Sequence, residues 1–253
     1  MKDFTQILNF CTKGIFNSAL CIIVNTHGST PRKTGSKMIV FESGEIYGTI
    51  GGGELEKKVI ESALEVIKTK KPVICKHELL QDHGMCCGGT VEIYIEPIQK
   101  IMNLYIFGAG HIGKTLARFA SELDFSVTLI DEREDAFNPI ENKDIKIIHK
   151  NHHLAFKQLE FAKNTFIAII THSHLYDREI LAYCLKHPFA YLGMIGSQRK
   201  VKMTGKMFLS GNIAGEEELK RIDMPMGIDI KAQTPEEIAI SILAKMIRVR
   251  AEL

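Results

Sequence analysis

The sequence has no large excess of charge of either sign. Its 32 Lys and Arg residues oppose 30 Asp and Glu residues, which leaves a formal net charge of +2 over 253 residues. No basic block stands clear of acidic neighbours, so the pattern typical of nucleic-acid and membrane-surface binding is absent. No apolar run approaches the roughly 20 residues that a transmembrane helix needs. We therefore expect neither a nucleic acid nor a membrane as a partner.

Cysteine is also scarce. Six cysteines do not make a disulfide scaffold in a chain of this length. They stand at Cys11, Cys21, Cys75, Cys86, Cys87 and Cys184. The opening segment MKDFTQILNFCTKG is amphipathic and lacks a signal-peptide core followed by a small-residue cleavage site. We expect a cytoplasmic protein with reduced thiols.

Residues 1–99 are expected to form an α+β module. The hairpin expected over 37–50 turns at Ser43 and Gly44. Pro97 and the polar IQK segment behind it mark the linker to the second half. Apolar spacing predicts helices over 3–15 and 51–70, and strands over 18–26, 71–80 and 90–97.

Residues 100–253 change to the pattern of βαβ units. Near the end, Thr234 is expected as an N-cap, with Pro235 at the first helical position and Glu237 completing a capping box. We predict an α/β protein in which the α+β module precedes a Rossmann-like, doubly wound parallel sheet. Its strands are expected at 102–107, 126–131, 145–148, 166–170 and 190–195.

The segment NLYIFGAGHIGKTLARFASELDFSVTLID carries a nucleotide-binding pattern. Gly108, Gly110 and Gly113 stand in G-x-G-x-x-G spacing between a strand and a helix. The first glycine permits a tight turn, the second lets the backbone approach a pyrophosphate, and the third lets the helix pack closely on the strand. Asp131 ends the next strand, where a carboxylate would accept a hydrogen bond from a ribose hydroxyl. The pattern predicts the fold more firmly than the ligand.

The loop THSHLYD should reach the same edge of the sheet, because ligands bind outside the carboxyl ends of parallel strands. A metal site there would use His172, His174 and Asp177. Alternatively, one histidine lines the ligand crevice and the others are solvated or hold the turn. Because no fourth ligand is evident, we predict no metal site.

The segment GMIGSQRK follows the last predicted strand. Ser197, Arg199 and Lys200 would suit an anionic group. The alternative is an ordinary helix start with surface charge.

Two glycine-rich loops of the first half offer backbone amides. In THGSTPRKTGSKM, Ser29 and Arg32 make a cradle for an oxyanion or a phosphate, although solvated basic loops are common. In GTIGGGELE, the amides at Gly51, Gly52 and Gly53 precede a helix. A carboxylate in the first turn of that helix, at Glu54, would repel an anion. Either the ligand also offers donors, or Glu54 has a packing and capping role.

Cys86 and Cys87 are adjacent and flanked by glycines in HGMCCGG. Neighbouring cysteines have poor geometry for one metal ion and strain a disulfide, which argues against a zinc site. A loop thiolate near basic groups could carry sulfur or ligate a soft metal. The alternative is that the two side chains pack under a turn.

Taken together, the motifs resemble the xanthine dehydrogenase accessory factor family, XdhC/CoxI, over nearly the whole chain. The first half contributes THGSTPRKTGSKM, GTIGGGELE and CGGTVEIYIEP, and the second contributes the glycine turn, ITHSHLYDREIL, FAYLGMIGSQRK, PMGIDI and TPEEIAISILA. With Glu54 after the glycines, the segment GTIGGGELE resembles the XdhC branch of the family, because the CoxI branch tends to have a cysteine at that position.

The resemblance implies a maturation protein rather than a turnover enzyme. Such a protein binds the molybdenum cofactor transiently, protects it and promotes its sulfuration with a cysteine desulfurase. It then helps to insert the cofactor into a molybdenum hydroxylase of the xanthine dehydrogenase type. Cys87 and His172 are the catalytic candidates, and Cys87 is preferred to Cys86 because it directly precedes the two glycines. The cofactor-binding candidates are Ser29, Arg32, Gly51, Gly52, Gly53, Cys87, Gly108, Gly110, His111, Gly113, Asp131, His172 and Ser197.

An NAD(P)-dependent oxidoreductase is the alternative. It would use His172 or His174 as general acid–base and Asp131 to select NAD, although Arg133 nearby could meet the 2′-phosphate of NADP. A pure scaffold, with both halves used for protein contacts, is a more remote alternative. The amphipathic helices predicted over 54–69 and 235–250 would suit a homodimer.

Overall fold

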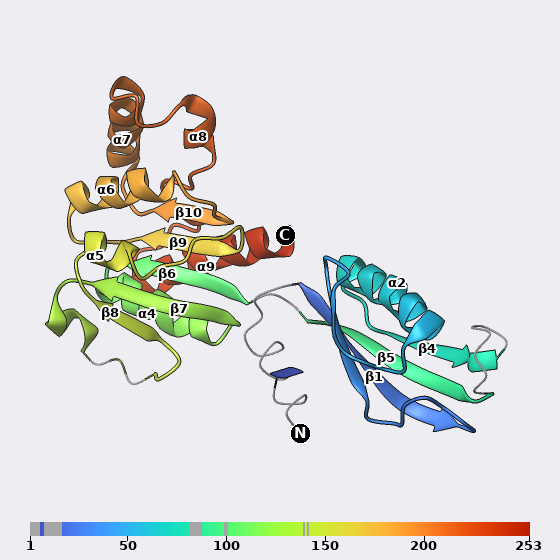
Figure 1. Ribbon diagram of the computed structural model, residues 1–253. Helices are drawn as coiled ribbons and strands as arrows, with labels where there is room; N and C mark the ends of the chain where they lie inside the picture. The colour runs from blue at the N-terminus through green and yellow to red at the C-terminus, as the bar shows by residue number, and fades with distance from the viewer. Residues whose placement is uncertain (1–5, 8–16, 81–87, 99–100, 139, 141) are drawn as a thin grey trace. The chain divides into compact units, whose positions relative to one another are not determined.

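The computed structural model describes residues 6–7, 17–80, 88–98, 101–138, 140 and 142–253. The chain divides into two compact units, Met1–Ile101 and Met102–Leu253 (Figure 1). The boundary expected from the sequence lies two residues earlier. Most of the helix predicted over 3–15, and both Cys86 and Cys87, lie outside the described residues.

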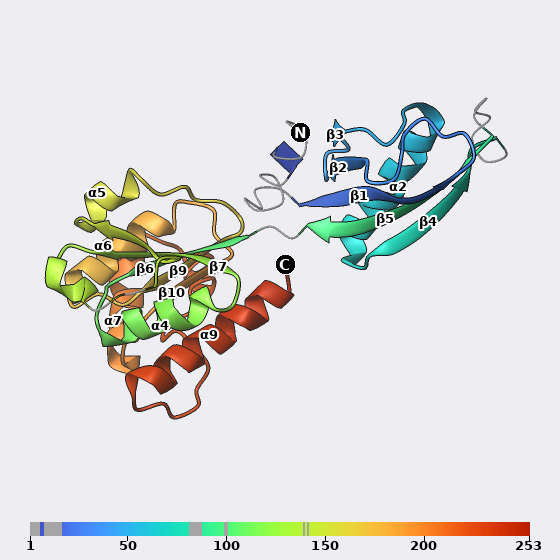
Figure 2. The same cartoon turned by 90° about the horizontal axis from the view of Figure 1, so that it is seen from below.

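The first unit is an antiparallel sheet with a helix on one face (Figures 1 and 2). The strands lie in the order β3-β2-β1-β5-β4. The hairpin predicted at Ser43 and Gly44 is confirmed, because the Gly44 N–H donates to the Phe41 carbonyl across the turn. The elements are β1 (Ser18–His27), β2 (Lys37–Phe41), β3 (Ile46–Gly48), α2 (Gly53–Thr69), β4 (Val73–Glu78) and β5 (Thr90–Ile98).

Alternation along the strands builds the core of this unit. Ala19, Cys21 and Ile23 of β1 all point to one face and are fully buried. Helix α2 packs on that face with side chains spaced three or four residues apart. They are Leu55, Val59, Ala63 and Val66.

The second unit is a parallel sheet in the order β10-β9-β6-β7-β8. This is the strand order of a Rossmann fold, with the first strand of the unit at the centre. All five predicted strands are confirmed to within a residue or two at their ends. They are β6 (Met102–Phe107), β7 (Phe125–Asp131), β8 (Lys146–His149), β9 (Thr165–Ile169) and β10 (Tyr191–Met194).

Helices cover both faces of this sheet, as a doubly wound fold requires (Figures 1 and 2). Leu104 and Ile106 of β6 face one core, and Tyr105 and Phe107 face the other, so residues 104–107 form an unbroken apolar run. One core includes α4 (His111–Ser121) and α9 (Pro235–Ala251), and the other includes α5 (His152–Phe156), α6 (His174–Cys184) and α7 (Gln198–Ser210).

Two short helices complete the unit, η1 (Glu134–Phe137) and α8 (Glu216–Lys220). The capping box predicted for the last helix is confirmed. Thr234 Oγ1 accepts from the Glu237 N–H, and the Glu237 carboxylate accepts from the Thr234 N–H. Within the described parts of the chain, no helix has the length and apolarity to span a membrane.

Candidate functional site

Packing requires two of the three glycines of the GAGHIG turn. A Cβ on Gly108 or on Gly113 would lie closer than 3.0 Å to backbone atoms, those of Ile170 and of Gly108 respectively. Gly108 also has a φ of +112°, which side chains rarely adopt. A Cβ on Gly110 would meet nothing within 4 Å. Two glycines are therefore fixed by packing, whereas Gly110 leaves open space at the turn.

Helix α4 starts at this turn with the features of an anion site. Its N-cap is Gly110, which provides no side-chain cap, and its first turn has no acidic residue. The first N–H groups of a helix and its dipole attract negative charge. His111 is the first residue of the helix and is exposed. The start of α4 can therefore receive a phosphate.

Asp131 is committed to contacts within the protein. Its carboxylate accepts from the Ala109 N–H at 2.8 Å and from Arg133 Nη2 at 2.9 Å. It also accepts from the Arg133 backbone N–H and Nε, each at 3.0 Å. Burial would raise the pKa of Asp131, but these hydrogen bonds and the Arg133 charge hold it below its ordinary value. The carboxylate stays ionised and ties the end of β7 to the glycine turn.

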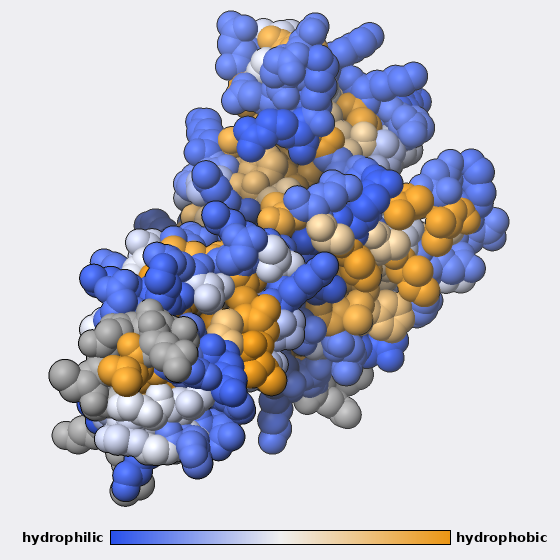
Figure 3. Space-filling view, turned by 90° about the vertical axis from the view of Figure 1, so that its right-hand side faces the viewer, coloured by the Kyte–Doolittle hydropathy of each residue, from blue (hydrophilic) through white to orange (hydrophobic). Residues whose placement is uncertain are grey.

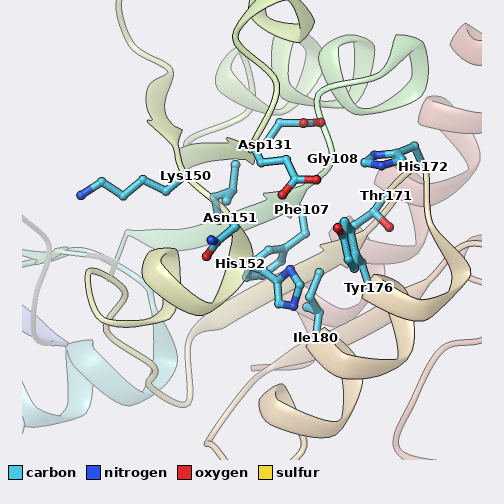
Figure 4. A pocket seen from close by; sticks show the side chains of 12 residues that line it. Phe107, Gly108, Asp131, Lys150, Asn151, His152, Thr171, His172, Tyr176 and Ile180 are labelled. Carbon is cyan, nitrogen blue, oxygen red and sulfur yellow. The ribbon is translucent and has the colours of Figure 1, made fainter.

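A pocket opens at the carboxyl ends of the strands beside these groups (Figure 4). Thr171, His172 and Tyr176 lie on one side of it, and Asn151 and His152 lie on another (Figure 4). The pocket has a volume of about 30 Å³, close to that of one water molecule, so it has room for a small polar group. The lining consists of Phe107, Gly108, Ile130, Asp131, Glu132, Lys150, Asn151, His152, Thr171, His172, Tyr176 and Ile180.

The structure does not assemble the three potential ligands of the THSHLYD loop. Asp177 is fully buried and accepts from Lys200 Nζ at 2.6 Å and Thr171 Oγ1 at 2.7 Å. His174 is exposed, and its Nδ1 lies 3.9 Å from Asp177 Oδ2. The His172 ring contacts the Tyr176 ring at 5.6 Å between centroids. Of the alternatives, the one in which a histidine lines the crevice agrees with this arrangement.

Ser197 caps α7. Its side chain accepts from the Lys200 N–H at 3.3 Å, as an ordinary N-cap does. The Lys200 ammonium donates to Asp177, so it holds α7 against α6. These contacts match the alternative of a helix start rather than an anion site.

A group of three potential ligands that the sequence did not reveal lies beside the pocket. His152 Nε2 is 2.9 Å from Glu179 Oε2, and His153 Nε2 is 3.6 Å from the same oxygen. Burial holds the pKa of His152 below its ordinary value, against the opposing effect of Glu179. In the sequence, the only signal was that His152 and His153 are adjacent and follow a predicted strand. This signal did not indicate that Glu179 would join them.

In the first unit, the glycine-rich motifs come together. A Cβ on Gly89 would lie closer than 3.0 Å to the Ser29 carbonyl, and one on Gly51 would lie 2.7 Å from Pro31 Cγ. The loop with Ser29 and Arg32 therefore contacts both the GTIGGG loop and Gly89. Ser29 and Arg32 are exposed. Cys87 is not among the described residues, but it directly precedes Gly88 in the sequence.

The amides of the GTIGGG loop already have an acceptor within the protein. Glu56 Oε1 accepts from the N–H groups of Ile50 at 3.1 Å, Gly51 at 3.3 Å and Gly52 at 2.9 Å. It also accepts from the Thr49 hydroxyl. Burial would raise the pKa of Glu56, but the four hydrogen bonds keep it below its ordinary value. From the sequence, Glu54 was considered as a packing or capping residue. The acceptor of the loop amides is instead Glu56, two residues further on.

Two other thiols of the chain are poor nucleophiles. Burial raises the pKa of Cys21 to about 12, with a smaller effect of Cys75. Burial also raises the pKa of Cys184. Both stay protonated at neutral pH, so they do not provide a thiolate.

These features define a two-module protein with a Rossmann unit whose glycine turn is open to a ligand. The model of the XdhC Rossmann domain matches residues 104–246, and that of the XdhC and CoxI family matches residues 17–78. The chain belongs to the XdhC and CoxI family.

Two curated relatives are similar to the chain. YqeB of Escherichia coli (strain K12), called an uncharacterized protein, is 33% identical over 238 residues, which are 92% of this chain and 43% of YqeB. A probable xanthine dehydrogenase subunit of Bacillus subtilis (strain 168) is 26% identical over 162 residues, which are 64% of this chain and 47% of that protein. The chain thus spans less than half the length of each relative.

A solved structure shares the fold. A crystal structure of a xanthine dehydrogenase from Bacillus halodurans aligns with a TM-score of 0.55 and 22% identity. The alignment covers 98% of this chain and 95% of that one.

Proposed function

We propose that this chain is an accessory factor of a xanthine dehydrogenase-type molybdenum hydroxylase. In this proposal it binds the molybdenum cofactor, protects it, promotes its sulfuration and hands it to the hydroxylase. Membership of the XdhC and CoxI family is the observation that carries the proposal. The name of the Bacillus subtilis relative supports the link to a xanthine dehydrogenase.

The residues of the second unit fit a pterin with a phosphate arm. The N–H groups at the start of α4 and the open space at Gly110 would hold the phosphate. The pocket itself is too small for the pterin, so in this proposal the exposed ring of His172 contacts the pterin from outside the pocket. When bound, the cofactor supplies the molybdenum centre that accepts sulfur, and the residues of the chain bind, orient and shelter it.

The first unit contributes a cysteine and basic groups to the proposal. Cys87 precedes the glycines that pack on the Ser29 loop, and Arg32 of that loop is exposed. A thiol and a guanidinium are groups that suit a sulfur-rich, anionic cofactor. A cysteine desulfurase as sulfur donor and the hydroxylase as acceptor are the partners in this proposal.

The proposal includes a homodimer. The apolar faces of α2 and α9 pack against their own sheets, so amphipathicity alone gives a dimer no support. Ile240 and Ile247 of α9 are exposed, and apolar patches interrupt the polar face drawn in Figure 3. Sedimentation that finds only monomer at micromolar concentration would exclude the dimer.

An NAD(P)-dependent oxidoreductase is the second candidate, favoured by the uncapped start of α4. His172 would be its general acid–base. The four contacts of Asp131 oppose it, because they occupy the carboxylate that would receive the ribose.

The test is a parallel titration of the reduced, anaerobic protein with molybdenum cofactor, NAD and NADP. Binding is followed by fluorescence, and retained molybdenum is measured after gel filtration. The variants are Cys87→Ala, Cys86→Ala as its neighbour control, and His172→Ala. We expect near-equimolar molybdenum in the wild type and the Cys86 variant, and less in the Cys87 variant.

Other outcomes separate the candidates. Tight nicotinamide binding without retained molybdenum, together with a dehydrogenase activity lost in His172→Ala, would favour the oxidoreductase. If none of the three ligands bound, both the accessory-factor and the oxidoreductase proposals would be contradicted. A pure scaffold would then be the remaining alternative.

A further inference from the structure

Three side chains from two helices converge next to the pocket of the second unit. His152 and His153 begin α5, and Glu179 lies in the middle of α6. Both imidazole Nε2 atoms approach the same oxygen of Glu179, and the three ligand atoms all lie within 4.8 Å of one another. In the described part of the chain, this is the group of three such side chains that comes close enough to share an ion.

The surrounding contacts fix the geometry of this group. The His152 side chain is 7% exposed, and its ring lies 5.0 Å from the Tyr176 ring and 5.9 Å from the Phe156 ring. The Asn151 side chain caps α5 by accepting from the Leu154 N–H. The helix start is thus defined, and the two histidine rings lie 4.1 Å apart.

The spacing matches a tetrahedral metal ion. Zinc bonds of about 2.0–2.1 Å to nitrogen and oxygen place neighbouring ligand atoms about 3.3 Å apart. The two separations from the histidine nitrogens to Glu179 Oε2, 2.9 and 3.6 Å, bracket that value, and the two nitrogens lie within 4.8 Å of each other. Two imidazoles and one carboxylate are also a ligand set that zinc uses with water in the fourth position.

We propose that His152, His153 and Glu179 bind one divalent first-row transition ion, with Zn²⁺ as the best match. The three ligands leave one coordination position open, which suits water or an oxygen atom of a ligand. His152 also lines the pocket, so the ion lies beside whatever the pocket holds. The site does not depend on the molybdenum cofactor, and it differs from the set of His172, His174 and Asp177 that the sequence raised.

The ligands that reach solvent allow a clean test. His153 and Glu179 have side-chain exposures of 68% and 38%, so replacing them should leave the fold intact. His174→Ala is the matched control, since His174 is a similarly exposed histidine on α6. The experiment strips the full-length protein of metal with a chelator and titrates it with Zn²⁺ against a chromogenic competitor.

We expect the wild type and His174→Ala to bind one more tight equivalent of Zn²⁺ than His153→Ala or Glu179→Gln. Zinc should raise the thermal midpoint of the first two proteins by several degrees more than that of the other two variants, because an ion that binds only the folded state stabilises it. X-ray absorption at the zinc edge should show two imidazoles. Equal stoichiometry in all four proteins, or a shell of sulfur ligands alone, would overturn the proposal.

Discussion

The buried carboxylate of Asp131 accepts a hydrogen bond from the backbone N–H of Ala109 at 2.8 Å, across 22 residues of sequence. This contact joins the end of β7 to the glycine turn that follows β6. Arg133 provides three further donors to the same carboxylate. A carboxylate has about four acceptor positions, so a ribose hydroxyl would have to displace one of these partners. In this structure Asp131 positions the turn.

We expect Asp131→Asn to lower the free energy of unfolding by about 1.5–3 kcal/mol, the range for hydrogen bonds to a charged group. The amide would keep the shape but would direct an NH₂ group at donors. Urea unfolding measures the loss. Asp135→Asn, an exposed change four residues away, should stay within about 0.5 kcal/mol of the wild type. An unchanged unfolding midpoint combined with lost NAD binding would show instead that Asp131 serves the ribose.

The glycines of the turn give a second prediction. We expect Gly113→Ala to destabilise the protein by about 1–3 kcal/mol or more, because its Cβ would clash with the Gly108 carbonyl. Gly110→Ala should change stability by less than about 1 kcal/mol, since its φ of −71° suits alanine and no atom lies near. Urea unfolding of the two variants measures the difference, and equal losses would contradict the packing role of Gly113.

The same Gly110→Ala variant tests the ligand. A methyl group in the open space should weaken binding of the phosphate-bearing ligand at least tenfold in the parallel titrations. Gly205→Ala in α7, where the new Cβ also meets nothing, is the control and should bind normally. Unaltered binding to the Gly110 variant would place the phosphate elsewhere.

Local patterns were sufficient to predict most of the fold. Apolar strands alternating with helices predicted the parallel sheet, because the central strands β6, β7 and β9 are buried on both faces. The capping box at Thr234 and the turn at Gly44 were equally local signals, and both are confirmed. Such features depend on residues only a few positions apart.

The contacts within the candidate site could not be predicted in this way. Glu179 follows His152 by 27 residues, and Lys200 follows Asp177 by 23. Which side chain meets which depends on how α5, α6 and α7 pack, and no short pattern encodes that packing. The failure at Glu56 is different, because the loop and the helix are adjacent in sequence. There the backbone conformation of the glycine loop brings its amides to Glu56. Glycine can adopt many backbone conformations, so the sequence alone does not specify this one.

The hydrogen bonds from the loop amides to Glu56 give a third prediction. We expect Glu56→Gln to lower the free energy of unfolding by about 1–2 kcal/mol, because three backbone N–H groups lose a charged acceptor. Glu54→Gln, on the same helix and exposed, should cost less than about 0.5 kcal/mol. Equal effects of the two changes in urea unfolding would contradict the role assigned to Glu56.

The stability that Glu56 contributes should depend on pH. Its pKa in the folded protein lies below the unfolded value of about 4.3, so its contribution is complete above that value. The contribution is lost as the pH falls through the folded pKa. The stability difference between wild type and Glu56→Gln should therefore be constant from about pH 5.5 to 7 and shrink below about pH 4.3. A difference that grows on acidification would contradict the lowered pKa.

The ion pair of Asp177 and Lys200 gives the last prediction. Asp177 has no exposed side-chain surface, Lys200 has 14%, and their charged atoms lie 2.6 Å apart. Removing one partner of a buried pair leaves an uncompensated charge and costs about 3–5 kcal/mol. We expect Lys200→Met to show a loss near this range in urea unfolding, with α7 loosened from α6 and faster amide exchange there. Lys220→Ala, which breaks the exposed pair with Glu217, should cost at most about 1 kcal/mol. If Lys200→Met were as stable as the wild type but bound the pocket ligand less well, Lys200 would belong to the ligand site. The GMIGSQRK segment would then be interpreted as an anion site rather than as an ordinary helix start capped by Ser197.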